Sequence, residues 1–141
     1  MNKFTYYENK IPETKKIMDL YQSVGWSNYT VDIDKLIAGI NNSSFVVCAY
    51  DGSLLVGLLR VISDNYTIAY VQDILVLPQY QNQGIGKKLV NLFLERFSDT
   101  RQKILLADDD QSLAYFYDAT GFSDSSKLKL ACYIYCGENE K

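Results

Sequence analysis

Two glycines stand at the start of a helix-forming stretch in the segment VLPQYQNQGIGKKLVNLF. Glycine is among the weakest helix formers, so Gly84 and Gly86 need another reason to lie there. The first turn of a helix leaves up to four N–H groups without intrahelical partners, and the helix dipole adds about half a positive charge. Residues without side chains let a phosphate reach those groups. The stretch therefore predicts a turn that binds a pyrophosphate.

Neighbouring side chains add to this prediction. Gln81 and Gln83 could donate hydrogen bonds, and Lys87 and Lys88 could bring positive charge to phosphate oxygens. Two better-known phosphate motifs are excluded, because a Rossmann fingerprint needs glycine at position 89, which is leucine, and a P-loop needs Gly at 81 and Ser or Thr at 88. The alternative is a tight turn whose glycines only let the helix pack closely on a strand.

The absence of histidine limits the possible chemistry. It excludes His-based zinc sites, Ser-His-Asp triads and Cys-His dyads, and we expect no metal. The three cysteines are Cys48, Cys132 and Cys136. The last two, if they lie in one strand, are roughly 13 Å apart and too distant to bridge. We interpret all three as reduced packing residues.

Composition and charge indicate an ordinary globular protein. The chain has 141 residues, of which 48% are hydrophobic and 22% charged, and we expect a single domain over residues 1–141. A net charge of −3 and a pI near 4.9 argue against nucleic-acid binding. We find no basic block for a membrane surface, no leader-like apolar stretch and no run of the ~20 residues that would span a bilayer. We therefore expect a cytoplasmic protein.

Hydrophobic periodicity predicts an α/β fold of α+β type. The predicted strands cover residues 3–8, 44–50, 54–62, 66–77, 103–107 and 127–136. The predicted helices cover residues 12–25, 31–44, 84–98 and 108–122, and a polar tail follows at 137–141. This order predicts a mixed sheet with helices on both faces.

Two motifs resemble those of a known family. The pattern Gln81-x-x-Gly84-x-Gly86, which follows ILVLP and opens a helix, resembles the acetyl-CoA signature of the GNAT superfamily of N-acetyltransferases. The segment DQSLAYFYDATGF resembles the family's second motif. In this second motif Asp110 replaces the usual asparagine and Leu113 the usual alanine, and the matching residues are Phe116, Tyr117, Gly121 and Phe122.

The resemblance implies a GNAT-like fold and a cosubstrate. Its central sheet is mixed, mostly antiparallel and splayed at the fourth strand, and the cosubstrate is acetyl-CoA. By the same resemblance, cofactor contacts are expected at Ile74, Val76, Gln81, Asn82, Gln83, Gly84, Ile85, Gly86, Lys87, Asp110, Phe116 and Tyr117.

The resemblance also implies catalytic roles. The Ile74 backbone N–H is expected to donate to the thioester carbonyl, where such a donor is worth about 3 kcal/mol. Tyr117 is expected to protonate the leaving thiolate; its alternative role is to pack beside Phe116. Asp73 is a candidate base, but strict alternation places its side chain on the face opposite Ile74 unless a β-bulge re-aims it. A structural role for Asp73, a water chain or a neutral amine are the alternatives.

The first helical region is expected to line the acceptor pocket. Aromatic and acidic side chains there suit a cationic amine, and they suit ordinary packing equally well. The candidates are Trp26, Tyr29 and Tyr70, with Tyr21, Asp32 and Asp34 nearby.

The resemblance predicts an enzyme that transfers acetyl from acetyl-CoA to a primary amine by direct attack in a ternary complex. A catalytically silent CoA-binding sensor module is the alternative. The acceptor is expected to be a small-molecule amine or a protein amino group, and the protein a monomer or homodimer.

Overall fold

The computed structural model describes residues 3–137, and the chain divides after Leu106 into two units. The first unit contains β1 (Thr5–Glu8), α1 (Thr14–Ser23), α2 (Ser27–Thr30), α3 (Ile33–Asn41), β2 (Phe45–Asp51), β3 (Leu54–Ser63), β4 (Ile68–Val76), the 3-10 turn η1 (Pro78–Tyr80), α4 (Ile85–Arg96) and β5 (Gln102–Leu105). The second contains α5 (Gln111–Ala119) and the 3-10 turn η2 (Ser125–Leu128). Among residues 3–137, no helix has the length and apolar character needed to cross a membrane.

One five-stranded sheet runs through the first unit in the order β1-β2-β3-β4-β5. The first four strands pair antiparallel, and β5 pairs parallel to β4 after the crossover through α4. Pairing between β4 and β5 covers only Ile68–Val71, although β4 continues to Val76. The predicted mixed, mostly antiparallel sheet that splays at its fourth strand is confirmed.

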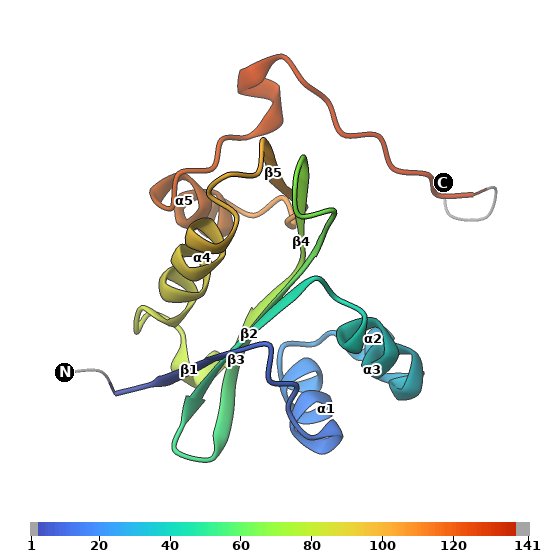
Figure 1. The fold of residues 1–141 in the computed structure, drawn as a ribbon, viewed down its shortest axis with the longest axis vertical. Coiled ribbons are helices and arrows are strands. Elements are labelled where there is room, and N and C mark those ends of the chain that lie inside the picture. Colours follow the sequence, from blue (N-terminus) through green and yellow to red (C-terminus); the bar gives the residue numbers. More distant parts are fainter. Residues whose placement is uncertain (1–2, 138–141) are drawn as a thin grey trace. The chain divides into compact units, whose positions relative to one another are not determined.

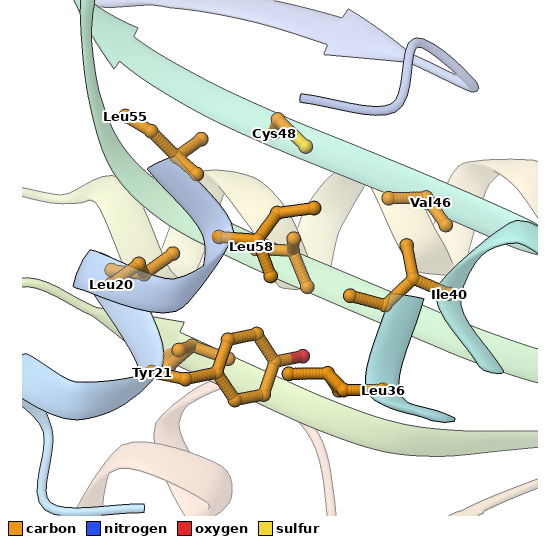
Figure 2. Packing of buried hydrophobic residues seen from close by; sticks show 10 residues of the cluster. Leu20, Tyr21, Leu36, Ile40, Val46, Cys48, Leu55 and Leu58 are labelled. Carbon is orange, nitrogen blue, oxygen red and sulfur yellow. The ribbon is translucent and has the colours of Figure 1, made fainter. Parts of the chain in front are cut away.

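Helices cover both faces of this sheet, as predicted (Figure 1). On one face, Leu58 packs in a buried cluster with residues of α1 and α3, among them Leu20 and Ile40 (Figure 2). On the other face, a Cβ added at Gly57 in β3 would lie 3.0 Å from Cγ2 of Ile85 in α4. Close packing of helix on strand, the alternative reason considered for Gly84 and Gly86, is therefore present at Gly57.

The helices form where periodicity and capping agree. α1 buries Ile17, Leu20 and Tyr21, which recur at helical spacing. α3 begins after Asp32, whose carboxylate accepts a hydrogen bond from the N–H of Lys35. The short helix α2, in the Trp26–Thr30 region, was not predicted, because four residues are too few to show a period.

The predicted strand at 127–136 is wrong. Residues Ser125–Leu128 form η2, which Asp124 caps, and Lys129 follows with a left-handed φ of 59°. None of residues 129–137 is assigned to a strand. The alternating KLKLACYIYC pattern specifies two faces but no partner edge, and η2 takes up the beginning of the segment. Most of the predicted polar tail, residues 138–141, lies outside the described residues.

Candidate active site

The first part of the candidate site is the edge of β4 that β5 leaves uncovered. The Leu77 N–H donates to the Val56 carbonyl of β3 at 2.9 Å. Successive backbone N–H groups of a strand point to opposite edges. The N–H groups of Ile74 and Val76 therefore point away from β3, toward the side where β5 has diverged. Beyond Val71 this edge is unpaired within the described sheet.

The second part is the start of α4, which no side chain caps. Gly84 is the N-cap residue with a left-handed φ of 86°, and the Lys88 N–H donates to its carbonyl at 3.0 Å. The preceding three N–H groups, of Ile85, Gly86 and Lys87, have no intrahelical partner. A Cβ at Gly84 would meet no atom within 4 Å. The backbone conformation, and not crowding within the chain, therefore favours glycine here.

Side-chain amides close the loop that leads into α4. Gln81 Nε2 donates to the Val76 carbonyl, and Gln83 Nε2 donates to the Gln79 carbonyl, both at 3.4 Å. Asn82 has a left-handed φ of 63°, which asparagine tolerates better than most residues. The predicted cofactor residues of this loop thus lie together between the end of β4 and the start of α4.

Asp73 lies at the centre of a buried polar network. Its side chain pairs with the Arg60 guanidinium of β3 through Nε, and only 2% of Asp73 is exposed. The Tyr21 hydroxyl donates to Oδ2 at 2.9 Å, and the Tyr29 hydroxyl donates to Oδ1 at 3.0 Å. Gln72 Nε2 donates to the Tyr29 hydroxyl at 3.3 Å. Each carboxylate oxygen of the predicted base therefore accepts at least one hydrogen bond.

A β-bulge at Gln72 sets the direction of these side chains. Arg60 pairs with Asp73 and the next residue of β3, Val61, pairs with Val71, so that Gln72 has no partner in the ladder. The extra residue puts Gln72 and Asp73 on the same face, where both reach Tyr29. The bulge precedes Asp73, so the Asp73 and Ile74 side chains still point to opposite faces.

Charge and burial shift the pKa values of the network. Burial, followed by the charge of Asp73, raises the pKa of Tyr21 far above its ordinary value. The same two causes, in the same order, raise the pKa of Tyr29. Burial alone would lower the pKa of Arg60, but its hydrogen bond to Asp73 and the charge of that residue outweigh burial and raise it. The tyrosines are therefore neutral donors, and Arg60 stays charged.

The predicted acceptor residues of the first helical region form an aromatic cluster. The ring centroid of Trp26 lies 6.0 Å from that of Tyr21 and 5.9 Å from that of Tyr29. Trp26 and Tyr29 pack against the buried core without being fully buried themselves. Tyr70 lies in β4, three residues before Asp73 and half-buried. Tyr29 is also a partner of Asp73. The acceptor role predicted for these residues stays a prediction.

In the second unit, Asp110 caps α5. Its Oδ1 accepts from the Ser112 hydroxyl at 2.6 Å and from the backbone N–H groups of Ser112 and Leu113 at 2.7 and 3.4 Å. The hydrogen bonds of Ser112, followed by that of Leu113, lower the pKa of Asp110. Its predicted cofactor contact stays a prediction.

Tyr117 packs between two phenylalanines of the second unit. Its ring centroid lies 5.1 Å from that of Phe116 and 5.9 Å from that of Phe122, both edge to face. Burial raises the pKa of Tyr117, so the phenol is protonated at neutral pH. The Tyr117 ring therefore has the packing role that was considered for it. An acid role would use the hydroxyl and not the ring, and it stays a prediction.

Sequence reasoning missed Arg60 and Gly57. A signal for Arg60 was present, because it is the only charged residue in LLVGLLRVI and Asp73 the only one in YTIAYVQDILVL. Single opposite charges in two apolar strands predict a buried ion pair once the strands are known to be neighbours. Nothing in the sequence alone marked Gly57 as the contact with α4.

Comparison with known proteins bears on the family and the fold. Residues 11–122 match the model of the Acetyltransferase (GNAT) family. A GNAT family acetyltransferase structure from Streptococcus pneumoniae TIGR4 superposes with a TM-score of 0.83 at 31% identity, covering 94% of this chain and 96% of that one.

More distant relatives carry related names. The chain is 25% identical over 118 residues to an uncharacterized N-acetyltransferase, ycf52, of Pyropia yezoensis, covering 81% of this chain and 67% of that protein. The structure of AAC(6′)-Iy in complex with the bisubstrate analog CoA-S-monomethyl-acetylneamine has a TM-score of 0.67 at 12% identity, covering 94% of this chain and 96% of that one. At 12% identity, the similarity to AAC(6′)-Iy concerns the fold alone.

Proposed function

The chain belongs to the acetyltransferase (GNAT) family, and on that premise we propose that it transfers acetyl from acetyl-CoA to a primary amine. The amine nitrogen attacks the thioester carbonyl while both substrates are bound. A carbon–nitrogen bond forms, the carbon–sulfur bond breaks, and the amine loses a proton while the thiolate gains one. No covalent enzyme intermediate is needed.

The observation that carries this proposal is a pair of open backbone donor sets in one short segment. The N–H groups of Ile74 and Val76 point away from β3 at the splayed edge, and the uncapped start of α4 follows after one loop. The helix start would bind the pyrophosphate, with Lys87 adding positive charge. The Ile74 N–H would then donate to the thioester oxygen as negative charge develops, a contribution of about 3 kcal/mol.

We assign the proton donor to Tyr117. Burial raises its pKa and keeps the phenol protonated at neutral pH, so the group can give a proton to the departing thiolate. The family resemblance at Phe116 and Tyr117 supports this role, and the ring packing against Phe122 would hold the hydroxyl in a fixed direction.

We assign Asp73 a positioning role in place of the base role considered from the sequence. The Asp73 carboxylate is buried, and it accepts from Arg60 and Tyr21 on one oxygen and from Tyr29 on the other, which favours a structural role over proton transfer. In this proposal, the network fixes the strand that carries Ile74. The amine then arrives neutral or loses its proton to water.

The same observation favours a second candidate, a catalytically silent CoA-binding module. If no group removes the amine proton, acetyl-CoA could bind without turnover. Release of CoA in the presence of amines separates the two functions. In the enzyme, Tyr117→Phe lowers kcat and leaves the acetyl-CoA Kd unchanged.

Calorimetric titration with acetyl-CoA tests the cofactor site, and a matched pair of glycines sharpens it. Gly84 and Gly25 have φ of 86° and 83°, and a Cβ at either would meet no atom within 4 Å. Replacement by alanine thus costs both a similar left-handed strain of about 1–2 kcal/mol. We expect Gly84→Ala to weaken acetyl-CoA binding at least tenfold and Gly25→Ala to leave it unchanged.

Two results would count against the proposal. Well-folded wild-type protein that does not bind acetyl-CoA would remove the cosubstrate and with it the acetyltransferase function. If Gly84→Ala and Gly25→Ala lose acetyl-CoA affinity equally, the loss in Gly84→Ala comes from backbone strain in general, and the phosphate contact at Gly84 is refuted.

A further inference from the structure

A pocket of about 310 Å³ opens between α2, α3 and the Arg60 side chain of β3. Its polar lining comes from Asn28, Tyr29, Asp32, Lys35 and Arg60, and Gly39 contributes backbone surface. The volume lies at the small end of the range for ligand sites, where an amino-acid-sized molecule fits. The pocket therefore suits a small ligand.

The Arg60 guanidinium has hydrogen-bond donors to spare on the pocket side. Arginine carries five N–H donors. Nε donates to Asp73, and Nη1 donates to the Ser43 hydroxyl at 3.3 Å. Among the described residues no other acceptor of Arg60 is found. Arg60 as a whole residue is 8% exposed. Gly39 also lines the pocket, and a Cβ built on it would lie 3.5 Å from Nη1 and 3.9 Å from Nη2 of Arg60.

A buried guanidinium whose outer donors face a pocket is a site for a planar anion. A carboxylate matches the donor geometry of arginine and can bind two N–H groups at once. Lys35, exposed at the rim, adds a second positive charge. Asp32 lies at the same rim, with Oδ1 accepting from the Lys35 backbone N–H. Its negative charge disfavours a free inorganic anion and suits a ligand that is also an amine.

We propose that this pocket binds the carboxylate of the acceptor, so that the acceptor is a small amine that also carries a carboxylate, as amino acids do. This rests on the proposed function, since it names the acceptor of that reaction. Arg60 pairs with Asp73 across the sheet, and Asp73 directly precedes Ile74. Arg60 is thereby connected, through the single residue Asp73, to the strand segment that we propose receives the thioester. Arg60 and Lys35 bind, and Tyr29 shapes the wall.

Three pairs of amines that differ only by a carboxylate provide the probes: lysine and cadaverine, ornithine and putrescine, and tyrosine and tyramine. Binding is followed through the fluorescence of Trp26, the only tryptophan, whose ring centroid lies 5.9 Å from that of the pocket residue Tyr29. For tyrosine and tyramine, whose own fluorescence overlaps, calorimetry replaces it. Turnover is followed by CoA release. We expect the carboxylate member of at least one pair to bind and to react at least tenfold better.

Two variants connect the preference to the pocket. Gly39→Ala puts a methyl group against the guanidinium at an ordinary contact distance of 3.5 Å, and alanine is the better helix former. We expect this variant to fold at least as stably as the wild type and to lose tenfold or more in carboxylate binding. Lys35→Gln should lose about threefold. The control Arg101→Gln, which removes an exposed cation from a residue that does not line the pocket, should lose nothing.

The inference and the proposed function fail differently. If acetyl-CoA binds and cadaverine, putrescine and tyramine match or exceed their carboxylate partners, the function stands and the carboxylate site is overturned. Retained carboxylate preference in Gly39→Ala would overturn it as well. If inorganic phosphate competes as strongly as the amino acids, the pocket is a general anion site and the acceptor assignment is wrong. Carboxylate binding without acetyl-CoA binding overturns the acceptor assignment together with the function.

Discussion

Substitution of Asp73 by asparagine tests whether this residue holds the strand or takes a proton. The change keeps the shape of the side chain and removes its charge. Arg60 then remains buried, with 9% of its side chain exposed, opposite a neutral amide. Breaking a buried ion pair by removal of one partner costs about 3–5 kcal/mol. Asparagine keeps one acceptor oxygen, so we expect a loss near the lower limit, about 3 kcal/mol.

Urea unfolding followed by circular dichroism measures this loss directly. In a separate thermal unfolding experiment, the same loss of about 3 kcal/mol should lower the midpoint by about 10 °C, because unfolding a chain of 141 residues carries an entropy of roughly 0.3 kcal/mol/K. Tyr21→Phe is the graded control, since it removes one hydrogen bond of 2.9 Å to the carboxylate but leaves the ion pair. A hydrogen bond to a charged group is worth about 1.5–3 kcal/mol. The double variant Arg60→Met/Asp73→Leu should recover most of the stability, because it leaves no unpaired charge.

A different result would refute the positioning role. If Asp73→Asn unfolds within about 1 kcal/mol of the wild type, the pair does not hold the strand. If kcat/KM then also loses its dependence on pH at the acidic side, Asp73 is the base and its contacts to Tyr21 and Tyr29 must open during turnover. Unchanged stability with unchanged activity would show that the network contributes to neither.

Three further predictions concern the framework around the site. Gly57→Ala should cost about 1–3 kcal/mol of stability in urea unfolding and weaken acetyl-CoA binding, since its Cβ would meet Ile85 at 3.0 Å and push the start of α4 outward. Burial raises the pKa of the Cys48 thiol to about 12. The contribution of this thiol to folding stability is therefore complete below the pKa of the unfolded thiol, about 8.5, and is lost as pH rises toward 12. Cys48→Ala should reduce that loss of stability at alkaline pH in unfolding experiments. The Thr67 hydroxyl and three backbone N–H groups hold the pKa of Asp64 well below its usual range; stability from this group is present above about pH 4 and lost as pH falls, so Asp64→Ala should destabilise the fold at pH 7 and much less at pH 2.

The sequence predicted the parts of the fold that local patterns specify. The strand around Val71 and the helix around Leu89 follow from periodicity, and the turn at Gly84 follows from the conflict between glycine and helix formation. The same local reasoning failed for residues 127–136, where alternation describes a strand but says nothing of a neighbour with which to pair. The missing information there is the partner edge, which no local pattern carries.

The candidate site divides in the same way. Backbone groups at Ile74 and Gly84 could be placed from spacing, because their direction depends on the strand and helix to which they belong. Asp73 could not be interpreted, because its role depends on Arg60, Tyr21 and Tyr29, which come from three other elements. A single charge in an apolar strand predicts an oppositely charged partner, but only the register of β3 against β4 identifies that partner as Arg60.

The bulge at Gln72 explains why these features occur together. A bulge increases the local twist and bends the strand that carries it. Pairing of β4 with β5 ends at Val71, one residue before the bulge, so the bend accounts for the divergence that exposes the Ile74 N–H. The extra residue also exchanges the faces of β4, so that Asp73 meets Arg60 beneath α1 and α2, while Val71 pairs with Val61 on the other side. One inserted residue therefore creates both the open backbone edge and the buried ion pair that braces it.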